Sequence, residues 1–176
     1  MEFIISREKL YLALQCIQGV VENRSSAMPI LQNTLVASEG KKLIRMLGTD
    51  LDVGLRGDFE AQITKGGSIT LNAKKLFDIV RELPDADVHL TEERDQWIRL
   101  RCERSDFRFP GLPPSDFPSL PDVEGVEPHS VSAKVLENMI RKTMFSISTD
   151  ETRYTYNGVF MESDGDILRL AATDGH

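Results

Sequence analysis

The amino-acid sequence predicts an α+β fold in which helices cover one face of antiparallel sheets. The main observation is an internal repeat: residues 33–50 and 157–174 align without a gap, and each opens with Asn and closes with Thr-Asp. Each segment holds two apolar runs around a polar turn that contains Gly, which is typical of a β-hairpin. A short strand and a helical pattern precede each hairpin. Repetition at a long fixed offset indicates that one structural unit has been duplicated.

The segments before the hairpins share one pattern, and a third copy of it lies between them. A short strand leads to Ser6, Asn72 or Ser132, and each of these residues stands at a helix N-cap position. Apolar residues then recur at helical spacing, so one stripe of each helix is expected to face a sheet. The pairs are, in chain order, strand 3–6 with helix 7–21, strand 68–72 with helix 73–83, and strand 129–132 with helix 133–146.

After the second helix the sequence again has strand character, at residues 87–91, 97–102 and 107–109. The predicted unit is therefore β-α-β-β with a further β, written β-α-β-β-β, and the chain holds two complete copies and most of a third. Five prolines crowd residues 110–121, which predicts a connector because Pro disrupts both helices and strand ladders.

This organisation predicts a complete domain over residues 1–122 and the first half of a second domain over residues 123–176. The end of the chain falls inside or just after a strand and has no polar tail, which favours a fragment of a longer protein. The alternative is a natural terminus with a few frayed residues.

The charge is unevenly distributed. The chain has 21 basic and 28 acidic residues and a net charge of −7. The three predicted helices hold eight basic and four acidic residues, so the rest of the chain carries −11. One explanation is that each helix has a solvated face of mixed charge, which commonly includes a few lysines. Three helices of the same sign also fit a shared anionic target, such as phosphates bound weakly and without regard to sequence.

Catalytic and metal-binding patterns are absent from the sequence: it has no Gly-rich phosphate loop, no HExxH and no Cys or His cluster. No cofactor is expected. Asp50 and Asp174 recur at matching repeat positions, where a turn-forming role is favoured. Cys16 and Cys102 are expected to be small buried residues in a reducing cytosol. Neither a signal peptide nor a membrane span is found, so a cytoplasmic protein is expected.

Several strings, in order along the whole chain, resemble the bacterial DNA polymerase III β subunit, the sliding-clamp family. They are residues 28–33 (MPILQN), 48–51 (GTDL), 116–118 (DFP) and 172–176 (ATDGH). The resemblance implies the DNA clamp fold: three similar domains per chain, and a head-to-tail homodimer closed into a ring around double-stranded DNA. It also implies a processivity factor that tethers DNA polymerase III, the clamp loader and other enzymes through short peptide motifs.

The resemblance implies three groups of site residues. DNA contacts are expected from Arg24, Lys74, Arg153 and Tyr154, the last two forming a loop suited to phosphate contact and base stacking. The alternative for that loop is an ordinary surface loop. One wall of a partner-peptide pocket and one side of a dimer interface are also expected. The wall would contain Tyr156, Thr173, Gly175 and His176, and the interface Arg104, Phe107 and Phe109.

The sequence departs from the family at two of these places. Tyr156 stands where an aliphatic residue is common, and Asp106 stands where a basic residue is frequent, so interfacial ion pairs should differ. The pocket is also expected to be incomplete. Two other functions stay open: a scaffold or adaptor of the same repeats that binds no DNA, and a carboxylate-dependent nuclease, which the lack of metal-ligand spacing disfavours.

Overall fold

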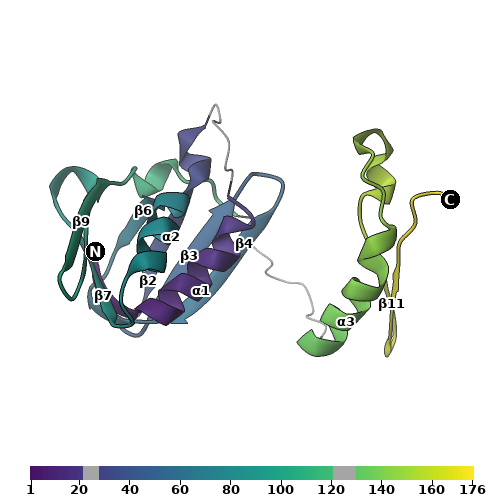
Figure 1. Cartoon of the computed structure of the whole chain (residues 1–176), viewed down its shortest axis with the longest axis horizontal. Coiled ribbons are helices and arrows are strands. Elements are labelled where there is room, and N and C mark those ends of the chain that lie inside the picture. Colours follow the sequence, from purple (N-terminus) through teal and green to yellow (C-terminus); the bar gives the residue numbers. More distant parts are fainter. Residues whose placement is uncertain (22–27, 121–129) are drawn as a thin grey trace. The chain divides into compact units, whose positions relative to one another are not determined.

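A computed structural model describes residues 1–21, 28–120 and 130–176. The chain divides into two compact units, Met1–Asp122 (unit 1) and Val123–His176 (unit 2), and each is described by itself (Figure 1). Both combine antiparallel strands with helices, so the predicted α+β class is confirmed.

Unit 1 contains two complete repeats. The first supplies β1, α1, β2, β3, β4 and β5, and the second supplies β6, α2, β7, β8 and β9. Their bounds are β1 (Glu2–Ser6), α1 (Arg7–Gln18), η1 (Pro29–Gln32), β2 (Asn33–Glu39), β3 (Leu43–Thr49), β4 (Gly54–Glu60), β5 (Gln62–Lys65), β6 (Ser68–Asn72), α2 (Ala73–Glu82), β7 (Asp87–Glu92), η2 (Arg94–Gln96), β8 (Trp97–Cys102), β9 (Ser105–Pro110) and η3 (Pro114–Asp116), where η marks a 3₁₀ helix.

The two repeats of unit 1 exchange their first strands. One sheet has the order β5-β1-β7-β8-β9 and the other β4-β3-β2-β6. Thus β1 of the first repeat pairs with β7 of the second, and β6 of the second repeat pairs with β2 of the first, both antiparallel. Each repeat therefore completes the sheet of the other, which relates the two repeats by an approximate two-fold axis.

The helices α1 and α2 lie side by side against the sheets (Figure 1). Their apolar stripes enter one core, in which Leu14, Ile17, Leu76 and Val80 have no exposed surface. The predicted caps of both helices are confirmed: the Ser6 side chain accepts a hydrogen bond from the Lys9 amide, and Asn72 accepts one from Lys75. α1 ends at Gln18, three residues before its predicted end.

A strap of residues 111–112 joins the two sheets of unit 1. The Thr70 hydroxyl, on β6, donates to the Leu112 carbonyl at 2.5 Å and accepts from the Leu112 amide at 2.9 Å. Gly111 donates its amide to the Gln96 carbonyl at 2.8 Å. An added Cβ at Gly111 would stand 2.5 Å from the Thr70 carbonyl oxygen, so the close approach requires glycine.

Unit 2 contains one repeat. Its elements are α3 (Ala133–Thr143), η4 (Met144–Ser146), η5 (Glu151–Tyr156), β10 (Phe160–Asp164) and β11 (Ile167–Ala171). The β10–β11 hairpin confirms the repeated hairpin, with the turn at Gly165 in a left-handed conformation (φ 56°).

Three local predictions are wrong. Residues 130–132 of the predicted strand 129–132 form no strand, and residue 129 lies outside the described residues. The Ser132 side chain makes no capping hydrogen bond. Cys16 is exposed because it lies on the outer side of α1, whereas Cys102 is fully buried as predicted.

Candidate nucleic-acid and partner interfaces

The basic residues of α1 are held by contacts within unit 1. Arg7 donates its Nε to the Val80 carbonyl at 3.0 Å and its Nη2 to the Arg81 carbonyl at 2.6 Å, which caps the carboxyl end of α2. Lys9 pairs with Glu60 of β4 at 2.5 Å, and this hydrogen bond lowers the pKa of the Glu60 carboxyl.

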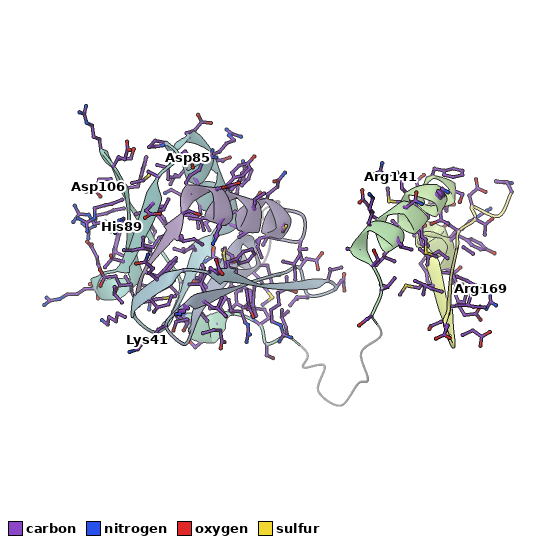
Figure 2. All side chains as sticks on the ribbon, turned by 90° about the horizontal axis from the view of Figure 1, so that it is seen from below. Lys41, Asp85, His89, Asp106, Arg141 and Arg169 are labelled. Carbon is purple, nitrogen blue, oxygen red and sulfur yellow. The ribbon has the colours of Figure 1, made fainter. Side chains whose placement is uncertain are left out.

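Three basic residues of α2 and α3 also pair with carboxylates of their own helix. Lys74 pairs with Asp78 at 3.1 Å, and Arg81 with Glu82 at 2.9 Å. On α3, Arg141 pairs with Glu137 (Figure 2 labels Arg141). Part of the positive charge predicted for the helices is thus offset locally by carboxylates. All these pairs are exposed, and exposed pairs contribute only about 0–1 kcal/mol each, so the cations can exchange a carboxylate for a phosphate.

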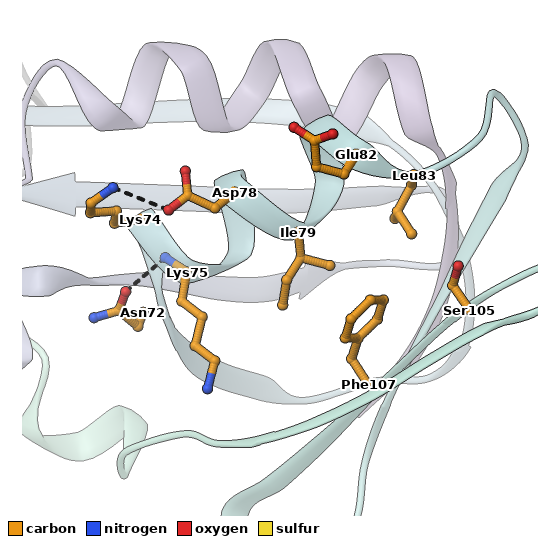
Figure 3. Close-up of a pocket in the computed structure, with 9 residues that line it drawn as sticks. All are labelled: Asn72, Lys74, Lys75, Asp78, Ile79, Glu82, Leu83, Ser105 and Phe107. Carbon is orange, nitrogen blue, oxygen red and sulfur yellow. Dashed lines mark hydrogen bonds and ion pairs between the residues drawn. The ribbon is translucent and has the colours of Figure 1, made fainter.

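A groove of about 500 Å³ runs between α2 and β9 (Figure 3). Ile79, Leu83 and Phe107 form its apolar floor, and the remaining lining residues are polar or charged. Those residues are Asn72, Lys74, Lys75, Asp78, Glu82 and Ser105. Ile79 was not among the residues expected from the sequence, although it is an apolar residue next to the predicted stripe of α2.

The strand beside this groove, β9, is the last in the five-stranded sheet. Phe107 is 39% exposed and its ring faces Ile79 in the groove (Figure 3). Phe109 lies on the same side of the strand but is only 2% exposed, because it packs in the core beneath the Lys75 ammonium, 5.7 Å from its ring centroid. The Phe109 side chain therefore offers little surface to a partner, whereas Phe107 and the exposed Arg104 do offer surface.

The opposite side of β8 and β9 carries a charge network. Arg99 donates to Asp106 at 2.9 Å from its Nε, and this hydrogen bond lowers the pKa of the Asp106 carboxyl (Figure 2 labels Asp106). Arg108 pairs with Glu93 at 2.5 Å and lies over the Trp97 ring, 5.4 Å from its centroid. The acidic residue at position 106 thus has a partner within its own sheet.

In unit 2, the predicted pocket wall is formed by the chain after β11 and the end of η5. Gly175 adopts a left-handed conformation (φ 92°) and donates its amide to the Thr173 hydroxyl at 3.0 Å. A Cβ on Gly175 would stand 4.0 Å from the Tyr156 ring and 3.5 Å from the Arg153 guanidinium. The structure thus brings Tyr156, Thr173 and Gly175 together, with His176 next in the chain.

Arg153 belongs to this wall as well as to the predicted DNA loop. Its Nη1 donates to the Asp174 carbonyl at 3.5 Å, and its Nε lies 3.7 Å from Asp150. Tyr154 is 80% exposed and so is open to a ligand. Arg24, the remaining predicted DNA contact, lies outside the described residues.

The repeated aspartates form turns, as predicted. Asp50 accepts hydrogen bonds from the amides of Asp52 and Val53 at 3.0 and 2.7 Å. Asp174 accepts one from the His176 amide at 3.0 Å. Both carboxylates therefore order their own backbone.

The described residues contain neither a metal-binding cluster nor a membrane-spanning helix. Across residues 1–21, 28–120 and 130–176, no group of three or more His, Cys, Asp or Glu side chains could hold a metal ion. Within the same ranges, no helix is long and apolar enough to cross a membrane.

Comparison with known proteins places the chain in a family. The paired β-α-β-β repeats of unit 1, with one further repeat in unit 2, define a clamp-type α+β protein. The model of the DNA polymerase III beta subunit N-terminal domain matches residues 1–121, and that of its central domain matches residues 130–176. The chain belongs to the DNA polymerase III beta subunit family.

Its relatives support this assignment. The beta sliding clamp of Vibrio cholerae is 40% identical over 182 residues, which cover 100% of this chain and 48% of that protein. The crystal structure of DNA polymerase III subunit beta from Pseudomonas aeruginosa is 37% identical, with a TM-score of 0.90 over 100% of this chain and 48% of that one. Caulobacter crescentus pol III beta is 41% identical over the same shares, with a TM-score of 0.86. The chain spans about half the length of these relatives.

Proposed function

We propose that this chain acts as part of a sliding clamp, a non-catalytic processivity factor that encircles duplex DNA and tethers DNA polymerase III. The observation that supports this most is that two successive domain models of the family match nearly the whole chain in order. On this proposal, residues 1–122 are a complete clamp domain and residues 123–176 are the first half of the next. A role on chromosomal DNA also implies a cytoplasmic location.

The groove between α2 and β9 is the proposed site of head-to-tail dimerisation. β9 is an edge strand whose outer backbone groups can pair with another strand. The apolar floor around Phe107 suits an aliphatic partner side chain, and the exposed Arg104 on the same side of unit 1 suits an acidic partner. Phe109 supports the interface from the core instead of contacting the partner.

DNA contact is proposed for Arg24, Lys74, Arg153 and Tyr154. Lys74 is already paired with Asp78, so its binding to a phosphate replaces one exposed ion pair by another. The resulting contacts are weak and independent of base sequence, as sliding requires. Retention on DNA then comes from closure of the ring.

The wall formed by Tyr156, Thr173, Gly175 and His176 is proposed to receive short peptide motifs of the polymerase and the clamp loader. Tyr156 is 39% exposed and presents a ring at the position where an aliphatic residue is common. Such docking raises the local concentration of an enzyme at its template.

A hybrid clamp tests the proposed function. Residues 1–176 replace the matching half of the Pseudomonas aeruginosa beta subunit, and the hybrid is loaded onto nicked circular DNA. We expect retention on the circle and loss after linearisation. Phe107→Asp should open the ring and abolish retention, whereas Val53→Asp, at a residue 55% exposed in a distant turn, should not. A dimeric hybrid that is not retained on circular DNA would refute the clamp and favour the adaptor.

A further inference from the structure

The chain of unit 1 passes between its two sheets at two matching places, which we call seams. At the first seam, Ala61 joins β4 of one sheet to β5 of the other and donates its amide to the Lys42 carbonyl at 2.9 Å. At the second seam, Gly111 follows β9 and donates its amide to the Gln96 carbonyl at 2.8 Å. The residue after Ala61 pairs with β1, and the residue after Gly111 pairs with β6. The approximate two-fold axis of unit 1 therefore relates the two seams.

The second seam is covered by the chain itself. Thr70 of β6, which pairs with Leu112 at this seam, is 1% exposed. Beyond Leu112, η3 packs on β6, and Phe117 forms a small apolar cluster with Ile30 and Leu31. The backbone of Phe117 is extended (φ −74°, ψ 131°). An extended segment that carries a large apolar side chain thus closes the sheet surface beside this seam.

The first seam is open and contains a pocket of about 620 Å³. Ile4 of β1 is the counterpart of Thr70, since it pairs with the residue after Ala61, yet it is only half-buried. The chain continues from this seam as β5, along the edge of the sheet, instead of crossing its face. Ile4, Leu43 and Ala61 are among the apolar residues that line the pocket. All of the lining residues belong to unit 1, and none of them lines the groove between α2 and β9.

The charged residues of the pocket come from both sheets and from α1. Lys9 of α1 and Glu60 of β4 pair with each other at 2.5 Å, so their charges are offset. Asp87 of β7 and Lys42, which precedes β3, are exposed, and neither forms an ion pair with any residue that the structure describes. The strands β7 and β3 belong to different sheets. A ligand that spans the pocket therefore meets a negative charge on one side and a positive charge on the other.

We propose that the pocket at the first seam binds an extended segment of a partner protein, in which a large apolar side chain lies between a basic and an acidic residue. The apolar side chain enters beside Ile4 and Leu43. The basic residue faces Asp87, and the acidic residue faces Lys42. The second seam is the reason to choose a protein segment as the occupant, because the matching surface there already holds one, anchored by Phe117. Pockets that combine an apolar lining with a few placed polar groups are typical binding sites.

Titration of the isotope-labelled 176-residue chain with synthetic peptides, followed by NMR, tests the proposal without DNA. The probe is a blocked five-residue peptide with Arg, Phe and Glu at alternate positions and Ser between them, because alternate residues of an extended segment face the same side. We expect it to shift the amide signals of Ile5, Ala61 and Gln62, which line the pocket. A peptide with Ala in place of Phe should bind at least about tenfold more weakly, because the apolar contact supplies most of the affinity.

Protein variants identify the place of binding. Leu43→Asp puts a charge among the apolar lining residues and should weaken binding of the probe about tenfold or more. Val53→Asp is the matched control, since Val53 is an exposed apolar residue beyond the other end of β3, and it should leave binding unchanged. Asp87→Lys should weaken binding of the probe about two- to fivefold, the range for one exposed ion pair, and should favour a peptide with Glu in place of Arg.

Four outcomes would overturn the proposal. The first two are an absence of shifts at the pocket with millimolar probe and equal binding of the Phe and Ala peptides. The other two are shifts centred on the groove between α2 and β9 and a preference for the Arg peptide that survives Asp87→Lys. The proposed clamp function holds or fails independently of these outcomes, because neither DNA nor ring closure enters the measurement.

Discussion

Replacing Thr70 by Val should destabilise unit 1 although the two side chains have nearly the same shape. Thr70 is 1% exposed, and its hydroxyl makes three hydrogen bonds. Two are with the backbone of Leu112, and the third is accepted from the side-chain amide of Asn33 at 3.3 Å. Val removes the hydroxyl and leaves these groups without their partner. Each buried polar group left unpaired costs about 1–3 kcal/mol, and Leu112 can recover part of this from water, so we expect a loss of about 2–3 kcal/mol.

Urea unfolding followed by fluorescence measures this loss in unit 1 alone, because Trp97 is the only tryptophan of the chain. With a typical urea dependence of about 2 kcal/mol per molar, the midpoint should fall by about 1 M. Thr70→Ser keeps the hydroxyl and serves as the control; it should lose less because only a methyl group is removed. A Val variant within about 0.5 kcal/mol of the wild type would refute the structural role assigned to the strap.

Three further predictions use the same measurement. Gly111→Ala should lower the free energy of unfolding by about 1–3 kcal/mol, because the new Cβ meets the backbone carbonyl of Thr70, which cannot move aside as a side chain can. An unaffected variant would mean that the strap can shift freely. Arg7→Lys should lower the free energy of unfolding by about 1–2 kcal/mol, because one ammonium cannot replace the two hydrogen bonds that the planar guanidinium donates to the end of α2. Full stability in the Lys variant would show that charge alone suffices. Arg99 lowers the pKa of Asp106, so this carboxylate stabilises the fold above its unfolded pKa of about 4 and loses that effect as pH falls through its lower folded value. The stability difference between wild type and Asp106→Asn should therefore be present at neutral pH and vanish in acid, and a difference independent of pH would contradict the ion pair.

The hairpins and the first two helices could be predicted from the sequence because their determinants are local. Apolar alternation around Gly40 and Gly165 specifies the turns, and both glycines adopt the left-handed conformation that such turns need. Ser6 and Asn72 are effective caps as soon as a helix follows them. These signals act within about ten residues, and no distant contact overrides them.

The strand before α3 could not be judged in this way. Val131 has the same local pattern as Ile5 and Leu71, yet only the latter two lie in strands. A single strand gains stability from the hydrogen bonds and side-chain contacts of a neighbour, so the local sequence defines a candidate and the neighbour decides. The burial of Phe109 and the exposure of Cys16 could not be predicted for a related reason. Periodicity identifies which face of a helix or strand is apolar, but only the packing of neighbouring elements determines which residues of that face are buried.

The ion pairs of the helices bear directly on how a clamp could hold DNA and still move. A free lysine that binds a phosphate gains the full interaction, whereas Lys74 must first leave Asp78, and Arg141 must leave Glu137. Each contact then gains only the difference in free energy between two exposed ion pairs, and each of those pairs contributes little. A ring lined by such exchangeable pairs has a nearly even energy along the duplex, because no single phosphate position is strongly favoured. On the proposed function, the carboxylates of these pairs belong to the sliding surface, and their removal should raise DNA affinity and slow diffusion along the duplex, rather than weaken the fold.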